Sequence, residues 1–187
     1  MKRIAILASG GGSNALKIME HFRSSEVAQV VFLSSNKAGA GALDKAESFK
    51  VEIAVHSTDD ISNGTLLKML TDRNIDLIVL AGYLKKISKE MIAAFPGQIV
   101  NIHPALLPKY GGKGMYGMNV HRAVKEASEP LSGMTIHYVN ENYDEGAIIR
   151  QESVELNPDD TAEEIAGKVL ELEHKWFAPT IEQILKT

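Results

Sequence analysis

Five short apolar runs, separated by segments with helical spacing, constrain the fold of the first hundred residues most strongly. The runs read RIAILA, VAQVVFLSS, VEIAVH, DLIVLA and GQIVNI. Between them lie SNALKIMEHF, GALDKAESFK, TLLKMLTDR and SKEMIAAF, in which apolar residues recur at helical intervals. Near-continuous apolar runs are typical of strands covered on both faces, and alternating strands and helices form βαβ units. The pattern therefore predicts an α/β fold with a mainly parallel sheet and helices on both faces.

The pattern changes after residue 104. A glycine-rich loop, KYGGKGMYG, leads to a predicted short helix, NVHRAVKEA. The segments GMTIHYVNE and GAIIRQESVEL then flank NYDEG, which indicates an antiparallel pair of strands joined by a tight loop. The C-terminal segment predicts a long helix with Asp160 or Thr161 as its N-cap and an interruption near Pro179.

Length, charge and composition narrow the classes of partner. The 187 residues suit a single domain, residues 1–187, and the formal net charge is −4 with both signs interspersed. This distribution lacks the basic footprint of a nucleic-acid-binding surface or a polybasic membrane patch. The apolar run before the first glycines is shorter than the core of a secretory signal, and no run approaches the ~20 apolar residues of a membrane span. We therefore expect a cytoplasmic protein with small-molecule partners, and neither nucleic acid nor membrane.

The residues ASGGGSNA follow the first predicted strand and open the first predicted helix. Gly10, Gly12 and Ala15 match the G-x-G-x-x-G/A spacing of dinucleotide sites, where backbone amides approach a phosphate. The acidic residue about twenty positions later is absent, and Ser13 with Asn14 replaces the Lys-Ser/Thr pair of a nucleoside-triphosphate loop. Two interpretations remain: a cradle for one phosphate, or a tight turn with Ser13 or Asn14 as helix cap.

A second candidate site lies in NIHPALLPKY, residues 101–110. Side chains two apart in a strand share a face, so Asn101 and His103 project together before Pro104 ends the strand. Ligands of open α/β sheets bind beyond the carboxyl ends of the strands, where these two residues lie. A carboxylate from Asp144 near His103 would raise the pKa of the imidazole and favour its charged form. The alternatives are a capping amide, a core histidine and a turn acid.

The residues absent from the chain limit the chemistry of this site. There is no cysteine, which excludes disulfides, thiolate metal sites and a thiol nucleophile. No G-x-S-x-G elbow and no metal-binding histidine spacing is present, so we expect no metal. An imidazolium beside a carboxamide stabilises an oxyanion or passes a proton to a leaving nitrogen. This set indicates direct attack of one substrate on another.

Five ordered blocks of the sequence resemble the phosphoribosylglycinamide formyltransferase family, the folate-dependent transferases of purine synthesis. The blocks are SGGGSN, DLIVLAGYLKKIS, NIHPALLPKY, GMTIHYVNENYDEGAII and LEHKWFAP, and they span essentially the whole chain. The resemblance implies a single-domain, mainly parallel sheet of seven strands in a Rossmann-like fold. It also implies transfer of a formyl group from 10-formyltetrahydrofolate, as co-substrate, to the amine of a glycinamide ribonucleotide. A monomer or weak homodimer is expected.

The resemblance also assigns roles to individual residues. The catalytic set falls on Asn101, His103 and Asp144. Substrate binding falls on the phosphate cradle and on an acid for the ribose hydroxyls: Gly11, Gly12, Ser13, Asn14 and Glu173. Contacts to the folate co-substrate fall on Leu84, Lys85, Lys86, Ile87, Asn101 and Asn140. The N-terminal half is thus expected to bind the phosphate and ribonucleotide, and the C-terminal half to bind folate and carry catalysis.

Other protein classes fit the sequence less well. A methionyl-tRNA formyltransferase would be expected to add a C-terminal RNA-binding domain and a basic surface. A formyltetrahydrofolate hydrolase would be expected to add an N-terminal regulatory domain, whereas the first strand is predicted from residue 3. A non-catalytic phosphate- or nucleotide-binding module would account for the glycine loop but would leave Asn101, His103 and Asp144 without a role.

Overall fold

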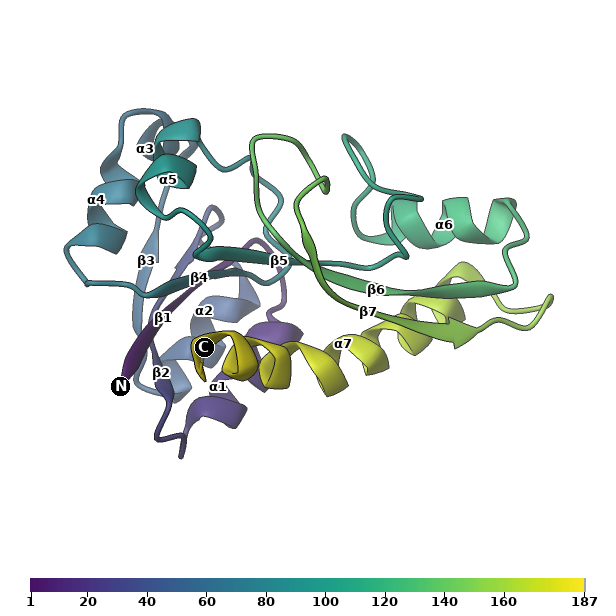
Figure 1. The fold of residues 1–187 in the computed structure, drawn as a ribbon, viewed down its shortest axis with the longest axis horizontal. Coiled ribbons are helices and arrows are strands. Elements are labelled where there is room, and N and C mark those ends of the chain that lie inside the picture. Colours follow the sequence, from purple (N-terminus) through teal and green to yellow (C-terminus); the bar gives the residue numbers. More distant parts are fainter. Residues whose placement is uncertain (187) are drawn as a thin grey trace.

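A computed structural model of the chain, which describes residues 1–186, is built on a seven-stranded sheet in the order β3-β2-β1-β4-β5-β6-β7 (Figure 1). The strands are β1 Lys2–Ala8, β2 Ala28–Ser35, β3 Glu52–Val55, β4 Leu77–Leu80, β5 Ile99–His103, β6 Leu131–Tyr138 and β7 Ile148–Glu155. The neighbouring strands among β1 to β5 pair in parallel, while β6 pairs antiparallel with both β5 and β7. The sheet is therefore mixed but mainly parallel, as predicted, and the predicted pair around NYDEG is confirmed as β6 and β7.

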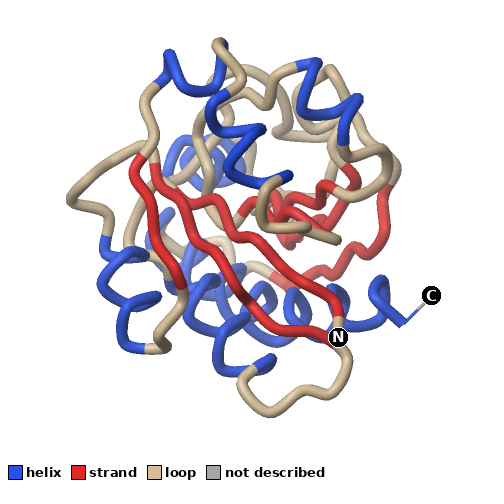
Figure 2. The backbone as a smooth tube through the Cα atoms, turned by 90° about the vertical axis from the view of Figure 1, so that its left-hand side faces the viewer, coloured by secondary structure: helices blue, strands red, loops and turns tan. Residues whose placement is uncertain are grey.

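Helices cover both faces of the sheet (Figures 1 and 2). They are α1 Ser13–Phe22, α2 Gly41–Ser48, α3 Thr58–Ser62, α4 Thr65–Thr71, α5 Lys89–Ala94, α6 Met118–Glu126 and α7 Ala162–Lys186. The side chains of β1 alternate between two cores: Ile4 and Ile6 pack with α1, α2 and α7, while Ala5 and Leu7 pack with α4 and α5. Continuous apolar runs therefore fill both sides of the sheet. Among residues 1–186, no helix is both long and apolar enough to cross a membrane.

Capping explains where two of the helices begin. Thr161 Oγ1 accepts a hydrogen bond from the Glu164 amide, and Glu164 Oε2 accepts one from the Thr161 amide, so the predicted cap at Thr161 is confirmed. Ser57 and Asp60 form the same reciprocal arrangement at the start of α3. The sequence prediction missed α3, which is short and has no buried residue.

The predicted interruption near Pro179 is wrong, because α7 continues to Lys186. A proline removes one backbone donor and crowds the preceding turn. Pro179 and Lys175, four residues earlier, are both exposed, so solvent can satisfy the carbonyl that loses its donor. Ala178, Thr180 and Ile181 on either side of the proline are buried and hold the helix against the sheet.

The strand order places three loops side by side at the carboxyl edge of the sheet. β1 lies next to β4, and β4 lies next to β5, so the loops that follow these strands begin together. The Ser9 amide donates to the Gly82 carbonyl at 3.1 Å, which joins the first two loops. The glycine loop, the segment at residues 82–88 and the loop after His103 thus share one edge.

Candidate active site

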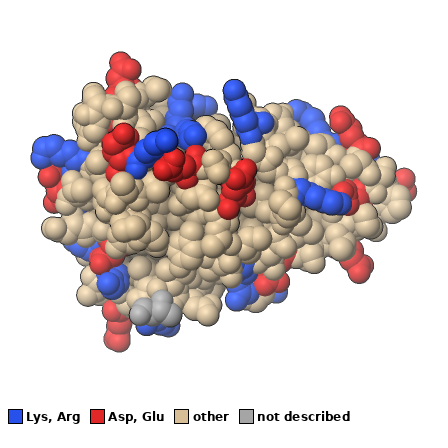
Figure 3. All heavy atoms as spheres, turned by 45° about the horizontal axis from the view of Figure 1, so that its top comes forward, with Lys and Arg blue, Asp and Glu red and all other residues tan. Residues whose placement is uncertain are grey.

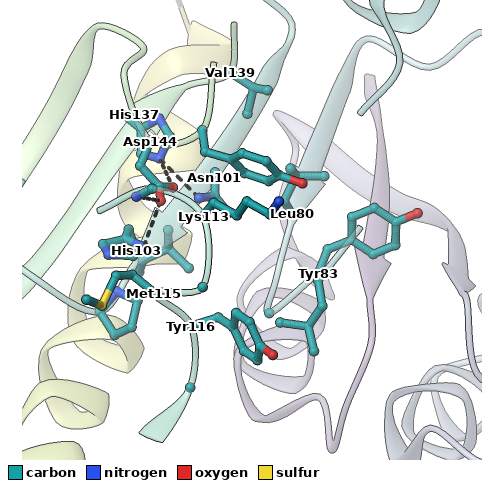
Figure 4. Close-up of a pocket in the computed structure, with 18 of the residues that line it drawn as sticks. Leu80, Tyr83, Asn101, His103, Lys113, Met115, Tyr116, His137, Val139 and Asp144 are labelled. Carbon is teal, nitrogen blue, oxygen red and sulfur yellow. Dashed lines mark hydrogen bonds and ion pairs between the residues drawn. The ribbon is translucent and has the colours of Figure 1, made fainter. Parts of the chain in front are cut away.

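A pocket of about 580 Å³ opens at this edge of the sheet (Figure 4). Its walls come from the loops after β4, β5 and β6 and from α6 and α7. The structure brings together in its lining ten of the residues singled out in the sequence: Asn14, Leu84, Lys85, Lys86, Ile87, Asn101, His103, Asn140, Asp144 and Glu173. Gly11, Gly12 and Ser13 are not among the lining residues and lie beside the pocket, before Asn14.

His103 is the last residue of β5 and is 4% exposed. Its Nε2 lies 2.7 Å from the Tyr110 carbonyl, which can only accept, so Nε2 carries a hydrogen. Its Nδ1 lies 3.6 Å from a carboxylate oxygen of Asp144. The ring is therefore fixed from one side by backbone and faces an acid on the other.

Asp144 reaches the site from the loop between β6 and β7. Its backbone adopts φ 57°, a left-handed conformation that Asp tolerates better than most residues, and the Gly112 amide donates to its Oδ2 at 2.9 Å. Two residues later the chain passes so close to β6 that a Cβ on Gly146 would lie 1.6 Å from the Tyr138 carbonyl oxygen. Only glycine allows this approach, which brings the loop back over the end of β5.

His137 completes the cluster, and the sequence reasoning gave it no role. Its Nε2 lies 3.6 Å from Asp144 Oδ1 and 3.0 Å from the Asn101 side-chain nitrogen, and its Nδ1 lies 2.9 Å from the Tyr138 carbonyl (Figure 4). The antiparallel register pairs Asn101 with His137. The missing signal was this register, because the sequence indicates that β6 exists but not which of its residues meets Asn101.

The charge states of the cluster differ in part from expectation. Burial lowers the pKa of His103, and the neighbouring carboxylate of Asp144 offsets only part of this effect. Asp144 thus raises the pKa of His103 as expected, but the net shift is downward, because loss of hydration outweighs the ion pair. Burial alone would raise the pKa of Asp144, but the neighbouring rings of His137 and His103 and the hydrogen bond from the Gly112 amide together lower it. Asp144 is accordingly ionised at neutral pH.

The glycine loop has a packing requirement of its own. Gly12 has φ 74° and precedes α1, and a Cβ there would lie 2.6 Å from the Cα of Ala42 in α2. The helix has Gly12 at its N-cap and no side-chain cap, so a cap by Ser13 or Asn14, one of the two interpretations of this loop, is wrong. Lys45 of α2 donates to the Gly11 carbonyl at 2.8 Å and places a positive charge beside the loop. The loop thus combines close packing with amides and a cation suited to an anion.

Asn14 and Glu173 meet in the lining of the same pocket. The Asn14 side-chain nitrogen donates to Glu173 Oε2 at 2.6 Å, joining α1 to α7. Glu173 is 7% exposed, and burial raises its pKa while the bond from Asn14 partly opposes the rise. The Oδ1 atom of Asn14 is buried without a hydrogen-bond partner in the described part of the chain. A buried acid and an unpaired acceptor facing a pocket suit the hydroxyls of a ligand.

The residues described contain no group of three or more His, Asp or Glu side chains arranged to hold a metal ion. The lining of the pocket instead contains amides, imidazoles and carboxylates, several of them at hydrogen-bonding distances from a neighbouring group. Such an arrangement provides proton transfer and stabilisation of a developing negative charge.

Comparisons with known proteins agree with this arrangement. A family model described as Formyl transferase matches residues 2–181. The chain is 43% identical over 98% of its length to a chloroplastic phosphoribosylglycinamide formyltransferase of Arabidopsis thaliana, but spans only 65% of that relative. It is 34% identical to the Bacillus subtilis phosphoribosylglycinamide formyltransferase, with 99% of this chain and 95% of the relative covered.

A solved structure shows the same architecture. The phosphoribosylglycinamide formyltransferase of Brucella melitensis superposes with a TM-score of 0.89 at 34% sequence identity. The match covers 100% of this chain and 96% of the other. Fold and sequence therefore agree over nearly the entire chain, and the chain belongs to the formyl transferase family.

Proposed function

We propose that the chain transfers a formyl group from 10-formyltetrahydrofolate to the amine of 5-phosphoribosylglycinamide in purine synthesis. The products are the formylglycinamide ribonucleotide and tetrahydrofolate. The convergence of Asn101, His103 and Asp144 in one pocket, together with Leu84–Ile87 and the Asn14–Glu173 pair, carries the proposal. The names of the Arabidopsis thaliana and Bacillus subtilis relatives support it. A cytoplasmic location and a monomer or weak homodimer stay predictions.

The reaction begins when the neutral amine of the ribonucleotide attacks the formyl carbon. A carbon–nitrogen bond forms, and the formyl oxygen gains negative charge in a tetrahedral intermediate. The side-chain nitrogen of Asn101 has two hydrogens, one directed at His137 Nε2, which leaves the other for this oxygen. The imidazolium of His103 supplies a second donor and a positive charge.

Collapse of the intermediate breaks the bond between the formyl carbon and N10 of the folate. The amine loses one proton and N10 gains one, so the overall transfer is balanced. The ionised carboxylate of Asp144, 3.6 Å from both His103 and His137, favours the protonated form of His103 as negative charge develops nearby. A water molecule bound in the pocket carries the proton between the two nitrogens.

The remaining residues are assigned to the two substrates. We assign the ribonucleotide phosphate to the amides of Gly11, Gly12, Ser13 and Asn14, and the ribose hydroxyls to Glu173. We assign the folate ring to Leu84–Ile87 with Asn101 and Asn140. On the face in Figure 3, charged residues of both signs are interspersed, which suits small substrates better than a polyanion.

The glycine loop offers a test that separates folding from phosphate binding. Gly12→Ala is expected to lower the free energy of unfolding by about 2–5 kcal/mol. The new Cβ would overlap Ala42, and residue 12 has a left-handed backbone conformation that alanine disfavours. Gly11→Ala is the matched variant, because no heavy atom of the described residues lies within 4 Å of its added Cβ. It is expected to keep the stability and raise the KM for the ribonucleotide several-fold. Denaturant unfolding and steady-state kinetics check both; an unchanged KM in Gly11→Ala would contradict the phosphate assignment.

Glu173 offers a test in which stability and binding change in opposite directions. A carboxyl whose pKa is raised on folding loses stability as the pH rises through that pKa. Glu173→Gln is therefore expected to raise the Tm, more at pH 8 than at pH 5, because the glutamine carries no buried charge. The same variant is expected to raise the KM for the ribonucleotide but to leave unchanged the KM for glycinamide, which lacks the sugar.

Glu171→Gln serves as the control for that experiment. Glu171 is exposed on the same helix, so its replacement is expected to change neither the Tm nor either KM. If Glu173→Gln weakens the binding of the ribonucleotide and of glycinamide equally, this would argue against recognition of the ribose by Glu173.

A spectrophotometric assay with 10-formyl-5,8-dideazafolate tests the proposed activity. Absorbance of the deformylated product is expected to rise only when glycinamide ribonucleotide is also present. Turnover without the ribonucleotide would indicate a hydrolase, and no turnover in its presence would overturn the proposal.

A further inference from the structure

A buried chain of three polar side chains ends at the wall of the pocket. Ser34 Oγ lies 2.7 Å from His56 Nδ1, and His56 Nε2 lies 2.7 Å from the Tyr83 hydroxyl. The three residues are 0%, 1% and 9% exposed, respectively. They come from β2, from the end of β3 and from the loop after β4, so these three hydrogen-bonded side chains join the sheet to that loop.

The hydrogens of this chain can be assigned from its ends. Ser34 Oγ also donates to the Ala54 carbonyl at 3.1 Å, so it accepts from His56 Nδ1. His56 Nε2 then accepts from the hydroxyl of Tyr83. Each link thus has one donor and one acceptor, with His56 neutral, and burial lowers the pKa of His56 accordingly. A fully satisfied buried chain of this kind fixes its members in one geometry.

Tyr83 is the residue directly before the segment assigned to the folate. Its ring lines the pocket across from His103 and Asp144, and its hydroxyl points away from them (Figure 4). The next residue is held independently: the Leu84 amide donates to Ser9 Oγ at 2.9 Å, and Ser9 Oγ donates to Asn36 Oδ1 at 2.6 Å. Two consecutive residues, Tyr83 and Leu84, are therefore anchored to side chains at the ends of β1, β2 and β3.

We propose that His56 is a positioning residue for the folate co-substrate, acting through the Tyr83 hydroxyl on the backbone of Leu84–Ile87. The inference rests on the proposed function, because it takes formyl-folate as the ligand of that segment. His56 touches no substrate, and its effect is on binding of the folate alone. Asn14 and Glu173 lie on other elements, so ribonucleotide binding does not depend on the hydrogen bonds that join Ser34, His56 and Tyr83.

Tyr83→Phe is the most conservative test, because it keeps the ring and removes only the hydroxyl. The Kd for 10-formyl-5,8-dideazafolate, measured by calorimetry, and its KM are expected to rise by about 3- to 10-fold, as for loss of one neutral hydrogen bond. The KM for the ribonucleotide is expected to stay unchanged. Tyr138→Phe is the control, because Tyr138 lies outside the pocket and contacts His137 through its backbone carbonyl.

A double-mutant cycle with His56→Gln decides whether the two residues act through one contact. The double variant is expected to bind folate no more weakly than the worse single variant, since both changes remove the same link. Additive losses, equal losses for both substrates or an unchanged folate Kd in Tyr83→Phe would each overturn the positioning role. If the wild-type protein does not bind the folate at all, the proposed function itself fails, and this outcome is distinct from the other three.

Discussion

Replacing His103 by alanine is expected to lower kcat for formyl transfer by about 10²–10³-fold, the usual cost of removing one oxyanion donor. Both KM values are expected to change much less, because His103 acts on charge that develops only after the amine attacks. Steady-state kinetics at saturating concentrations of both substrates provide the measurement.

His21→Gln is the matched control for that variant. His21 contacts Glu182 at 2.8 Å, and it is not among the residues lining the pocket, so its replacement is expected to leave kcat unchanged. A His103→Ala protein that folds normally and keeps kcat within about threefold of wild type would show that His103 is not an oxyanion donor.

Asp144→Asn is expected to lower kcat by about 10²-fold or more, because the amide keeps the shape of the carboxylate but not its charge. The carboxylate raises the pKa of His103 against the opposing effect of burial, so its loss should lower that pKa further. The acidic region of the rate profile, where His103 stays protonated without help, is expected to suffer least.

NMR titration of the histidine ring resonances in wild type and Asp144→Asn measures this effect directly. Asp159→Asn, an exposed change outside the pocket, is expected to leave the titration of His103 unaltered. If the pKa of His103 does not fall in Asp144→Asn, the electrostatic role of Asp144 is wrong, even if activity is lost.

Much of the fold could be predicted because local pattern and global position agree. Every predicted strand is present, and α1 spans the predicted residues Ser13–Phe22. Apolar runs buried on both faces leave little freedom in where a strand lies. Asn101 and His103 could be placed for the same reason: a proline ends their strand at the edge where ligands bind in such sheets.

The remaining features depend on contacts between distant segments. The position of His137 beside Asn101 follows from the register of β6 against β5, and the tight approach of Gly12 follows from the packing of α1 against α2. Neither the strand register nor the helix packing can be predicted from the residues at these positions alone. The lowered pKa of His103 likewise reflects how completely the fold buries the ring, which the neighbouring acid only partly offsets.

Following the formyl carbon itself tests the proposed activity most directly. With 10-formyltetrahydrofolate labelled with ¹³C at the formyl group, the NMR signal is expected to move to the formamide of the ribonucleotide in the wild-type protein. In His103→Ala the transfer is expected to slow by the same factor as kcat. Appearance of ¹³C-formate instead of the formamide, or transfer at an equal rate in both proteins, would contradict direct formyl transfer at this site.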